Sequence, residues 1–185
     1  MGKGIGGHQR AYEGKNDEWL TPPHILKPLG HFDLDPCSPI VPPWQIADKT
    51  YNKNDNGLLQ PFQGRVFMNP PYGPETAKWL KKLADHGNGI ALIFARTETA
   101  MFFSHVWNSA DGILFIEGRL HFCNVQGERA KHNSGGPSCL VAYGKENADC
   151  LENCGIPGKF VRLDSVQRTD TADDQQMDEL LLDFT

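Results

Sequence analysis

The segment Asn69-Pro70-Pro71-Tyr72 combines residue types that can hold a primary amino group on a planar molecule. The side-chain oxygen of Asn69 can accept one hydrogen bond from the amine, and the constrained carbonyl of Pro70 can accept a second. The ring of Tyr72 offers a flat face for stacking. Two fixed acceptors favour a tetrahedral nitrogen whose lone pair is directed at an electrophile, which predicts catalysis largely by positioning. The alternative is a proline-rich turn that only ends a strand.

The position of this segment supports the catalytic interpretation. It follows the apolar run 65–68, which we expect to be a strand that stops where the two prolines begin. In open α/β sheets the ligand site lies beyond the carboxyl ends of the strands. The same reasoning about spacing predicts other strands at 31–35, 90–94 and 112–116, and helices at 24–29, 75–86 and 99–107.

The remaining segments complete the expected fold. We expect residues 118–122 and 138–143 to pair as a hairpin around the polar loop 124–137. Thr21 is well placed as a helix cap, with Pro22 at the first helical position. The order of the elements predicts an α/β fold, a three-layer α/β/α mixed sheet with antiparallel strands at one end. Residues 36–64 are rich in Pro, Asn and Gly, and such a long irregular stretch is more often functional than idle.

The chain divides by composition into a flexible Gly-rich arm (1–16), one folded domain (17–163) and an acidic tail (164–185). The net charge of −5 comes mainly from the tail, which holds seven acidic residues and one basic residue. The rest holds 16 acidic and 17 basic residues, so charge does not exclude nucleic acid. A neutral body predicts at most a modest basic patch, with weak and salt-dependent binding.

The sequence gives no indication of a membrane protein, a secreted protein, a disulfide framework or a metal site. No apolar run approaches the roughly 20 residues of a membrane span, and the first ten residues lack the apolar stretch of a secretion signal, so we expect a cytoplasmic protein. The five cysteines, without a CxxC pair, are expected to be free thiols. No metal is expected, because a zinc site would draw on residues without the usual ligand spacing, namely His121, Cys123, His132 and Cys139.

An ordered series of short motifs runs from residue 17 to residue 143. Its members are Asp17-Glu18-Trp19-x-Thr21-Pro22, Phe32-Asp33-Leu34-Asp35-Pro36-Cys37, Asp55-Asn56-Gly57-Leu58, Asn69-Pro70-Pro71-Tyr72-Gly73, Ala95-Arg96-Thr97 and Gly118-Arg119-Leu120-x-Phe122. With these motifs the chain resembles the phage-type DNA N-6-adenine methyltransferases, a family of Rossmann-like, S-adenosylmethionine-dependent enzymes. The Asn-Pro-Pro-Tyr segment alone is less specific, because it also occurs in amino-methyltransferases of RNA and protein.

The resemblance implies site-specific methylation of N6 of adenine in DNA, with S-adenosylmethionine as cofactor. It assigns the catalytic positions to Asn69, Pro70, Pro71 and Tyr72. It assigns cofactor binding to Trp19, Thr21, Pro22, Asp35, Pro36, Cys37, Asp55 and Asn69. Chemically, Asp35 suits the α-amino group of the cofactor, and the Thr21 hydroxyl with backbone NH groups suits its carboxylate.

Three of these assignments compete with plainer alternatives. Asp35 also fits a turn before Pro36, and Trp19 could pack on the cofactor or only on the core. Asp55 or Asn56 could recognise the ribose or adenine of the cofactor, or could belong to a solvated loop. One departure from most Rossmann-like methyltransferases is that residues 35–39 contain no glycine to allow close approach to the cofactor.

DNA is the expected partner. Because the amine of adenine lies inside the base stack of a duplex, we expect the base to be flipped out and held against Tyr72. The candidate DNA-binding residues are Arg96, Arg119, Phe122, Arg129 and Lys131, although each charge also fits a solvated surface. The oligomeric state is left open between a monomer and a weak dimer. If the protein is phage-encoded, its compartment is the host cytoplasm.

Two other functions remain as alternatives. An amino-methyltransferase acting on RNA adenine or on a protein glutamine would meet the same planar NH2 group. The resemblance to methyltransferases that modify glutamine is weaker, because those enzymes are longer chains with a helical substrate domain and an intact Gly-rich loop. Neither feature is found in this sequence. A non-catalytic phage DNA-binding protein belongs to a different class, and the neutral body counts against it because such binders carry a clear basic excess.

Overall fold

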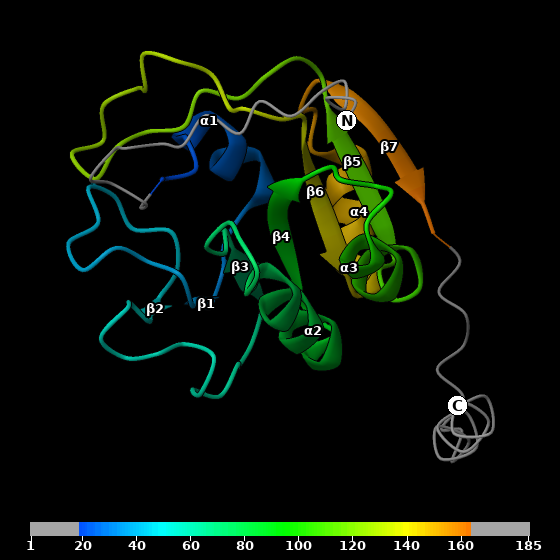
Figure 1. Cartoon of the computed structure of the whole chain (residues 1–185), viewed down its shortest axis with the longest axis horizontal. Helices are drawn as coiled ribbons and strands as arrows, with labels where there is room; N and C mark the ends of the chain where they lie inside the picture. The colour runs from blue at the N-terminus through cyan, green and yellow to red at the C-terminus, as the bar shows by residue number, and fades with distance from the viewer. Residues whose placement is uncertain (1–18, 164–185) are drawn as a thin grey trace, which may run out of the picture.

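The computed structural model describes residues 19–163, in which one mixed sheet is flanked by helices (Figure 1). The predicted arm (1–16) and acidic tail (164–185), together with Asp17 and Glu18, lie outside the described residues. The strands are β1 (Leu34–Asp35), β2 (Lys49–Thr50), β3 (Val66–Met68), β4 (Gly89–Phe94), β5 (Gly112–Ile116), β6 (Ser138–Tyr143) and β7 (Gly158–Arg162). The helices are α1 (Pro23–Leu26), continued by a 3₁₀ turn (Lys27–Leu29), α2 (Thr76–His86), α3 (Ala100–Phe102), continued by a π-helical turn (Phe103–Trp107), and α4 (Lys145–Asn153).

The strand order in the sheet is β2-β1-β3-β4-β6-β5-β7. Strands β2, β1, β3 and β4 run parallel to one another. Strand β6 is antiparallel to both of its neighbours, β4 and β5, and β7 is antiparallel to β5. The predicted mixed α/β sheet with antiparallel strands at one end is therefore confirmed, and it is consistent with a Rossmann-like methyltransferase.

Strand β4 is buried on both faces, as its continuous apolar run predicts. Ala91 and Ile93 belong to a core cluster that includes side chains of α2 and α3. The alternate residues Ile90 and Leu92 belong to a second cluster that includes side chains of α1 and α4. Because successive side chains of a strand point to opposite faces, these helix pairs cover opposite sides of the sheet.

The predicted hairpin between 118–122 and 138–143 is wrong. Residues 118–122 form no strand, and 138–143 instead becomes β6 between β4 and β5. Every residue of β6 is buried, which suits a central strand covered on both faces. In contrast, Gly118 and Arg119 are exposed. The pattern of 144–163 did not suggest α4 or β7, which the structure adds at the far end of the sheet.

The predicted cap of the first helix is displaced by one residue. Pro22 is the N-cap, with an extended backbone at φ −66° and ψ 146°, and Pro23 is the first helical residue. A residue before proline is pushed out of the helical region, so Pro22 cannot begin the helix ahead of Pro23. Thr21 therefore caps nothing, and its hydroxyl has no hydrogen-bond partner among the described residues.

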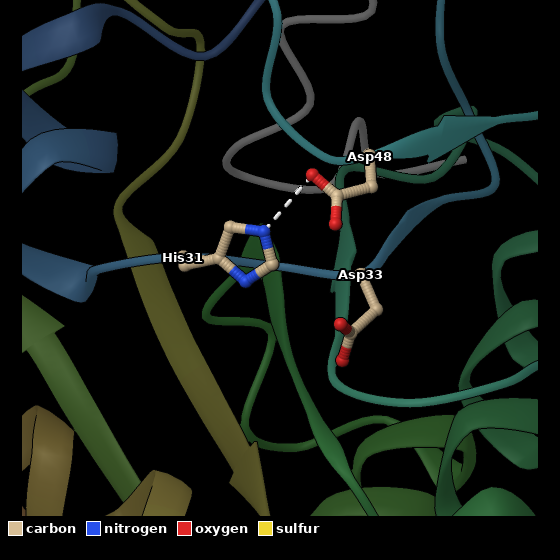
Figure 2. A group of neighbouring side chains, drawn as sticks. All are labelled: His31, Asp33 and Asp48. Atoms are coloured by element: carbon tan, nitrogen blue, oxygen red, sulfur yellow. Dashed lines mark hydrogen bonds and ion pairs between the residues drawn. The ribbon is translucent and has the colours of Figure 1, made fainter.

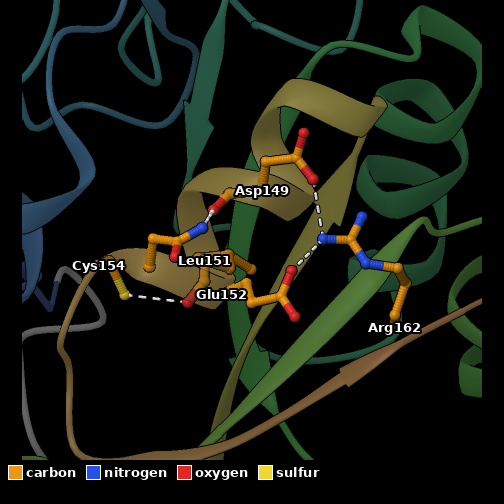
Figure 3. Close-up of polar contacts among 6 residues, drawn as sticks. Asp149, Leu151, Glu152, Cys154 and Arg162 are labelled. Atoms are coloured by element: carbon orange, nitrogen blue, oxygen red, sulfur yellow. Dashed lines mark hydrogen bonds and ion pairs between the residues drawn. The ribbon is translucent and has the colours of Figure 1, made fainter.

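Helix α4 and strand β7 are joined by a charged contact (Figure 3). The guanidinium of Arg162 on β7 donates to Asp149 over 2.8 Å and also to Glu152, one turn further along α4. The same guanidinium lies 5.4 Å from the centre of the Phe160 ring. These contacts fix the edge strand against the helix that covers one face of the sheet.

Arg65, just before β3, ties together segments that are far apart in the sequence. Its guanidinium donates to the carbonyls of Leu29 and His31 over 2.8 and 2.7 Å, and to Asn147 Oδ1 over 2.7 Å. It also lies over the ring of Phe32 at 4.4 Å. Asn147 is buried on α4, so the Arg65 side chain links α4 with the end of the 3₁₀ turn and with the segment that leads into β1.

We expect Arg65→Ala to lower the free energy of unfolding by about 2–4 kcal/mol, because it leaves partly buried acceptors without donors. Urea denaturation monitored by circular dichroism measures the change. Lys159→Ala on β7 is the control, because Lys159 is exposed. Equal effects of the two substitutions would contradict the role given to Arg65.

Within residues 19–163, none of the helices has the length and apolar character needed to span a membrane. The five cysteines are free thiols, as predicted.

Candidate active site

A pocket of about 280 Å³ lies beyond the carboxyl ends of the neighbouring strands β1 and β3. It is lined by residues 36–39 after β1, by residues 69–72 after β3, by parts of the loop 52–58, and by Trp19, Leu20, Glu75 and Trp79. This is the edge where α/β sheets bind their ligands. Its volume is close to the lower end of the range for small-molecule sites.

Asn69 is held in one orientation by the chain that enters the domain. Its side-chain nitrogen donates to the carbonyl of Trp19 over 2.7 Å. A carbonyl only accepts hydrogen bonds, so this contact fixes which end of the amide faces Trp19. The opposite end, Oδ1, is thereby presented to Tyr72, whose hydroxyl donates to it over 3.3 Å. Asn69 thus offers an oriented acceptor at the pocket.

The turn 69–72 is also fastened to the helix that follows it. Thr76, in the first turn of α2, donates from its hydroxyl to the carbonyl of Pro71 over 2.8 Å. The same hydroxyl accepts from the backbone N–H of Gly73 over 3.1 Å. Thr76 is buried, so these bonds are shielded from water. The helix α2 therefore sets the position of the turn.

Tyr72 belongs to an aromatic group at the edge of the site. Its ring stacks on Phe94, with centroids 4.4 Å apart and planes at 29°, and meets Phe122 edge-on at 6.3 Å. The residue keeps 37% of its surface exposed. The hydroxyl end is the more buried part, and this burial raises its pKa above the ordinary value, which already keeps a tyrosine protonated at neutral pH.

Asp35, the last residue of β1, carries a buried carboxyl group, and among the described residues no positive charge lowers its pKa. Burial raises its pKa to about 7, opposed by a hydrogen bond from the backbone N–H of Cys37 over 3.0 Å. The pKa of the Cys37 thiol is raised by burial and then by the charge of Asp35. A cationic ligand beside Asp35 would favour the ionised carboxylate.

The residues predicted to bind a cofactor divide into two groups. Trp19, Pro36, Cys37 and Asn69 line the pocket. Thr21, Pro22, Asp35 and Asp55 do not, although Thr21 follows the lining residue Leu20 and Asp35 precedes the lining residue Pro36. Asp55 instead stabilises its own turn by accepting from the backbone N–H of Asn52 over 2.9 Å. The neighbouring Asn56 lines the pocket.

The sequence reasoning assigned no individual site role to several lining residues: Leu20, Ser38, Pro39, Asn52, Lys53, Gly57, Leu58, Glu75 and Trp79. Trp79 had a usable signal, since it lies one helical turn after Glu75 at the start of the helix that follows the turn 69–72. Its apolar character made it look like a core residue, and it is indeed largely buried.

Gly57 allows the loop 52–58 to approach the segment after β1. A Cβ at this position would lie 2.5 Å from the carbonyl oxygen of Pro36 and 2.9 Å from the ring of Trp79. Residues 35–39 contain no glycine. Gly57 therefore makes the close packing of these two segments possible, and the shortest contact is to fixed backbone, the Pro36 carbonyl.

We expect Gly57→Ala to displace the loop 52–58, to lower stability by about 1–3 kcal/mol and to weaken ligand binding in the pocket at least severalfold. Thermal unfolding measures the first effect, and calorimetric titration with the cofactor that the sequence resemblance implies, S-adenosylmethionine, measures the second. Gly135→Ala is the matched control, because a Cβ there would meet nothing within 4 Å. Unchanged ligand affinity in Gly57→Ala would show that this loop does not shape the pocket.

The predicted DNA-binding residues are not equivalent. Arg96, Arg119, Arg129 and Lys131 are exposed, whereas Phe122 is buried and packs against Tyr72. Arg119 lies beside the aromatic group, because its guanidinium and the ring of Phe94 both flank Gly136. Phe122 therefore contributes to packing around the Tyr72 ring and does not offer an exposed surface for DNA.

A separate group of possible ligand side chains, His31, Asp33 and Asp48, lies at the exposed approach to β1 and β2 (Figure 2). His31 Nε2 pairs with Asp48 over 3.0 Å, and this hydrogen bond raises the pKa of the imidazole. Asp33 accepts from the backbone N–H of Arg65. Within residues 19–163 the structure does not gather the four residues considered for zinc: His121, Cys123, His132 and Cys139.

The mixed sheet, with a pocket and an oriented amide beyond β1 and β3, is consistent with the class of Rossmann-like methyltransferases. A family model described as DNA N-6-adenine-methyltransferase (Dam) matches residues 9–175. The chain belongs to this family, whose activity is the methylation of N6 of adenine in DNA. No curated protein and no solved structure matches the chain.

Proposed function

We propose that the protein transfers the methyl group of S-adenosylmethionine to N6 of adenine in DNA, acting on a base turned out of the helix. The observation that carries the proposal is the oriented Asn69 amide, whose Oδ1 is presented at the pocket by the bond to Trp19. We propose that residues 17–163 form the catalytic domain, as a three-layer α/β/α fold. Methylation is proposed to be specific for a short or loosely defined sequence.

Two buried residues next to the lining of the pocket suit the methionine part of the cofactor: Asp35 adjoins Pro36, and Thr21 adjoins Leu20. Asp35 is 3% exposed, and within residues 19–163 no positive group lowers the pKa of its carboxyl, so the α-ammonium would supply that partner. The hydroxyl of Thr21, 1% exposed and unpartnered within the described residues, can donate to the α-carboxylate. When bound, the cofactor supplies an electrophilic methyl group on a sulfonium.

In the proposed reaction, the two N–H groups of the adenine amine donate hydrogen bonds, one to Asn69 Oδ1 and one to the Pro70 carbonyl. These contacts draw the nitrogen toward tetrahedral geometry and direct its lone pair at the methyl group. As the new N–C bond forms at the expense of the sulfur–methyl bond, whose electron pair stays on a neutral thioether, positive charge builds on the nitrogen, and the two acceptors stabilise it. One proton of the amine then leaves to solvent. Tyr72 contributes its ring as a stacking surface.

The test uses the purified full chain with methyl-labelled cofactor and, separately, unmethylated DNA, RNA and protein. Mass spectrometry of the hydrolysed products identifies the methylated group. N6-methyladenine in DNA alone supports the proposal, whereas label in RNA or on a glutamine amide assigns the alternative activities. DNA binding without transfer to any of the three would indicate the non-catalytic protein. Methylation-sensitive nucleases then define the target sequence.

A further inference from the structure

In the structure, Tyr72 contacts the same acceptor atom that the proposed function assigns to the substrate. Tyr72 donates its hydroxyl to Asn69 Oδ1, the acceptor assigned to the adenine amine, over 3.3 Å. One face of its ring is covered by Phe94 at 4.4 Å. The Tyr72 hydroxyl therefore uses one of the two lone pairs of Asn69 Oδ1, and the amine of a bound base would share this oxygen with it or take its place.

Of the two stacked rings, Phe94 is the fixed one. It ends the central strand β4 and is paired across the sheet with Ser138 of β6, the last of six paired positions between these strands. Tyr72 lies in an exposed turn whose backbone is held by Thr76 through Pro71 and Gly73. Rotation about the side-chain bonds of Tyr72 moves its ring and leaves both the turn and Phe94 in place.

We propose that Phe94 is the second wall of the base-binding site, so that the target base inserts between Tyr72 and Phe94. This proposal rests on the proposed function. Two stacked contacts need ring planes about 7 Å apart, so Tyr72 must move outward by about 3 Å. The movement also releases Asn69 Oδ1 for the amine. The ring of Phe94 then specifies a planar aromatic substrate and positions it for transfer.

Two neighbouring side chains fit a nucleotide at this place. The guanidinium of Arg119 and the ring of Phe94 both lie beside Gly136, 3.8 and 3.4 Å from the position of an added Cβ. A cation there suits the phosphate of an extruded nucleotide. Ser138, opposite Phe94, is 2% exposed, and its hydroxyl has no hydrogen-bond partner within the described part of the chain. Adenine offers ring nitrogens that accept hydrogen bonds.

The test compares Phe94→Leu with the conservative variant Phe94→Tyr. The probe is a duplex carrying 2-aminopurine in place of an adenine that the wild-type protein methylates. We expect Phe94→Leu to raise KM for DNA about 5- to 100-fold, as loss of one base–aromatic stack does, with a smaller change in kcat. The fluorescence of the bound 2-aminopurine should rise because one quenching ring is lost, and Phe94→Tyr should restore both values. Affinity for S-adenosylmethionine should be unchanged, because Phe94 does not line the pocket.

Phe115→Leu makes the same change on β5, where Phe115 packs against Trp107. It is the control for a loss of stability alone. A KM and a 2-aminopurine signal unchanged in Phe94→Leu would overturn the proposal, as would equal effects of Phe94→Leu and Phe115→Leu. Failure of the proposed function is seen differently, because the wild-type protein itself would then transfer no methyl group to DNA.

Discussion

Asn69→Ala is expected to lower kcat for adenine methylation by about 100- to 1,000-fold, the usual effect of removing one preorganised hydrogen-bonding group from a reacting centre. Affinity for S-adenosylmethionine should largely persist, because the pocket has many other lining groups. Single-turnover methyl transfer measures the first quantity, and calorimetric titration measures the second. Near-wild-type turnover in Asn69→Ala would remove the main support for the proposed mechanism.

Asn69→Asp gives a sharper result, because it keeps an acceptor and changes only the end that faces Trp19. The Asn69 nitrogen donates to the Trp19 carbonyl over 2.7 Å. In the variant, an ionised carboxylate oxygen would face the Trp19 carbonyl oxygen, and both atoms only accept hydrogen bonds. The Trp19 carbonyl would lose its donor, at a cost of about 1–3 kcal/mol. We expect kcat to fall about 5- to 100-fold and to recover partly at low pH, where a protonated carboxyl can again donate to Trp19.

Asn153→Asp is the matched control for this change. Asn153 also donates its side-chain nitrogen to a backbone carbonyl, that of Asp149, over 2.8 Å, but it lies at the exposed end of α4. The same chemical change there should leave kcat and its pH dependence unaltered. If Asn69→Asp behaves as Asn153→Asp does, the contact with Trp19 is not what orients the catalytic amide.

The sequence was sufficient for the parts of the site that depend on local chemistry. Two prolines after an apolar run stop a strand wherever they occur, which placed the turn 69–72 at the end of β3. The continuous apolar run 90–94 likewise predicted a strand buried on both faces. These features need no knowledge of distant segments.

The features that the sequence did not predict depend on contacts between distant segments. Trp19 orients Asn69 across 50 positions of the chain, and no periodicity reports such a pair. Strand order also depends on distant segments. The segment 138–143 was therefore paired with 118–122 in the prediction, whereas in the structure it is β6 and pairs with β4 and β5. Phe94 ends an apolar run and reads as a core residue; only the structure brings its ring against Tyr72.

The second large effect concerns Asp35. Burial raises the pKa of its carboxyl from 3.8 to about 7, so the folded protein holds this proton more tightly than the unfolded chain. Between about pH 4 and pH 7 the unfolded chain loses the proton and the folded protein keeps it. Asp35 therefore lowers stability as pH rises through this range, and the full cost is present above pH 7. A change of this size corresponds to about 4 kcal/mol.

Asp35→Asn should remove this pH-dependent cost while its side-chain oxygen still accepts from the Cys37 N–H. We expect the variant to gain about 1–3 kcal/mol over the wild-type protein at pH 8, after allowing for its unpaired NH2 group, and to show little gain at pH 4. Urea denaturation at a series of pH values measures the difference. If the variant and the wild-type protein lose stability in parallel between pH 4 and pH 8, another group causes the loss.

The same substitution should weaken binding of S-adenosylmethionine at least tenfold, because the cationic α-amino group loses its carboxylate. In the wild-type protein that cation should pull the pKa of Asp35 down, so binding near pH 7 should release a proton. Calorimetric titrations in buffers of different ionisation enthalpy detect the proton directly. A variant that is more stable at pH 8 yet binds the cofactor poorly would mean that the ionised Asp35 carboxylate destabilises the free protein and is needed to bind the ligand. Full cofactor affinity in Asp35→Asn would show that the carboxyl is buried for another reason.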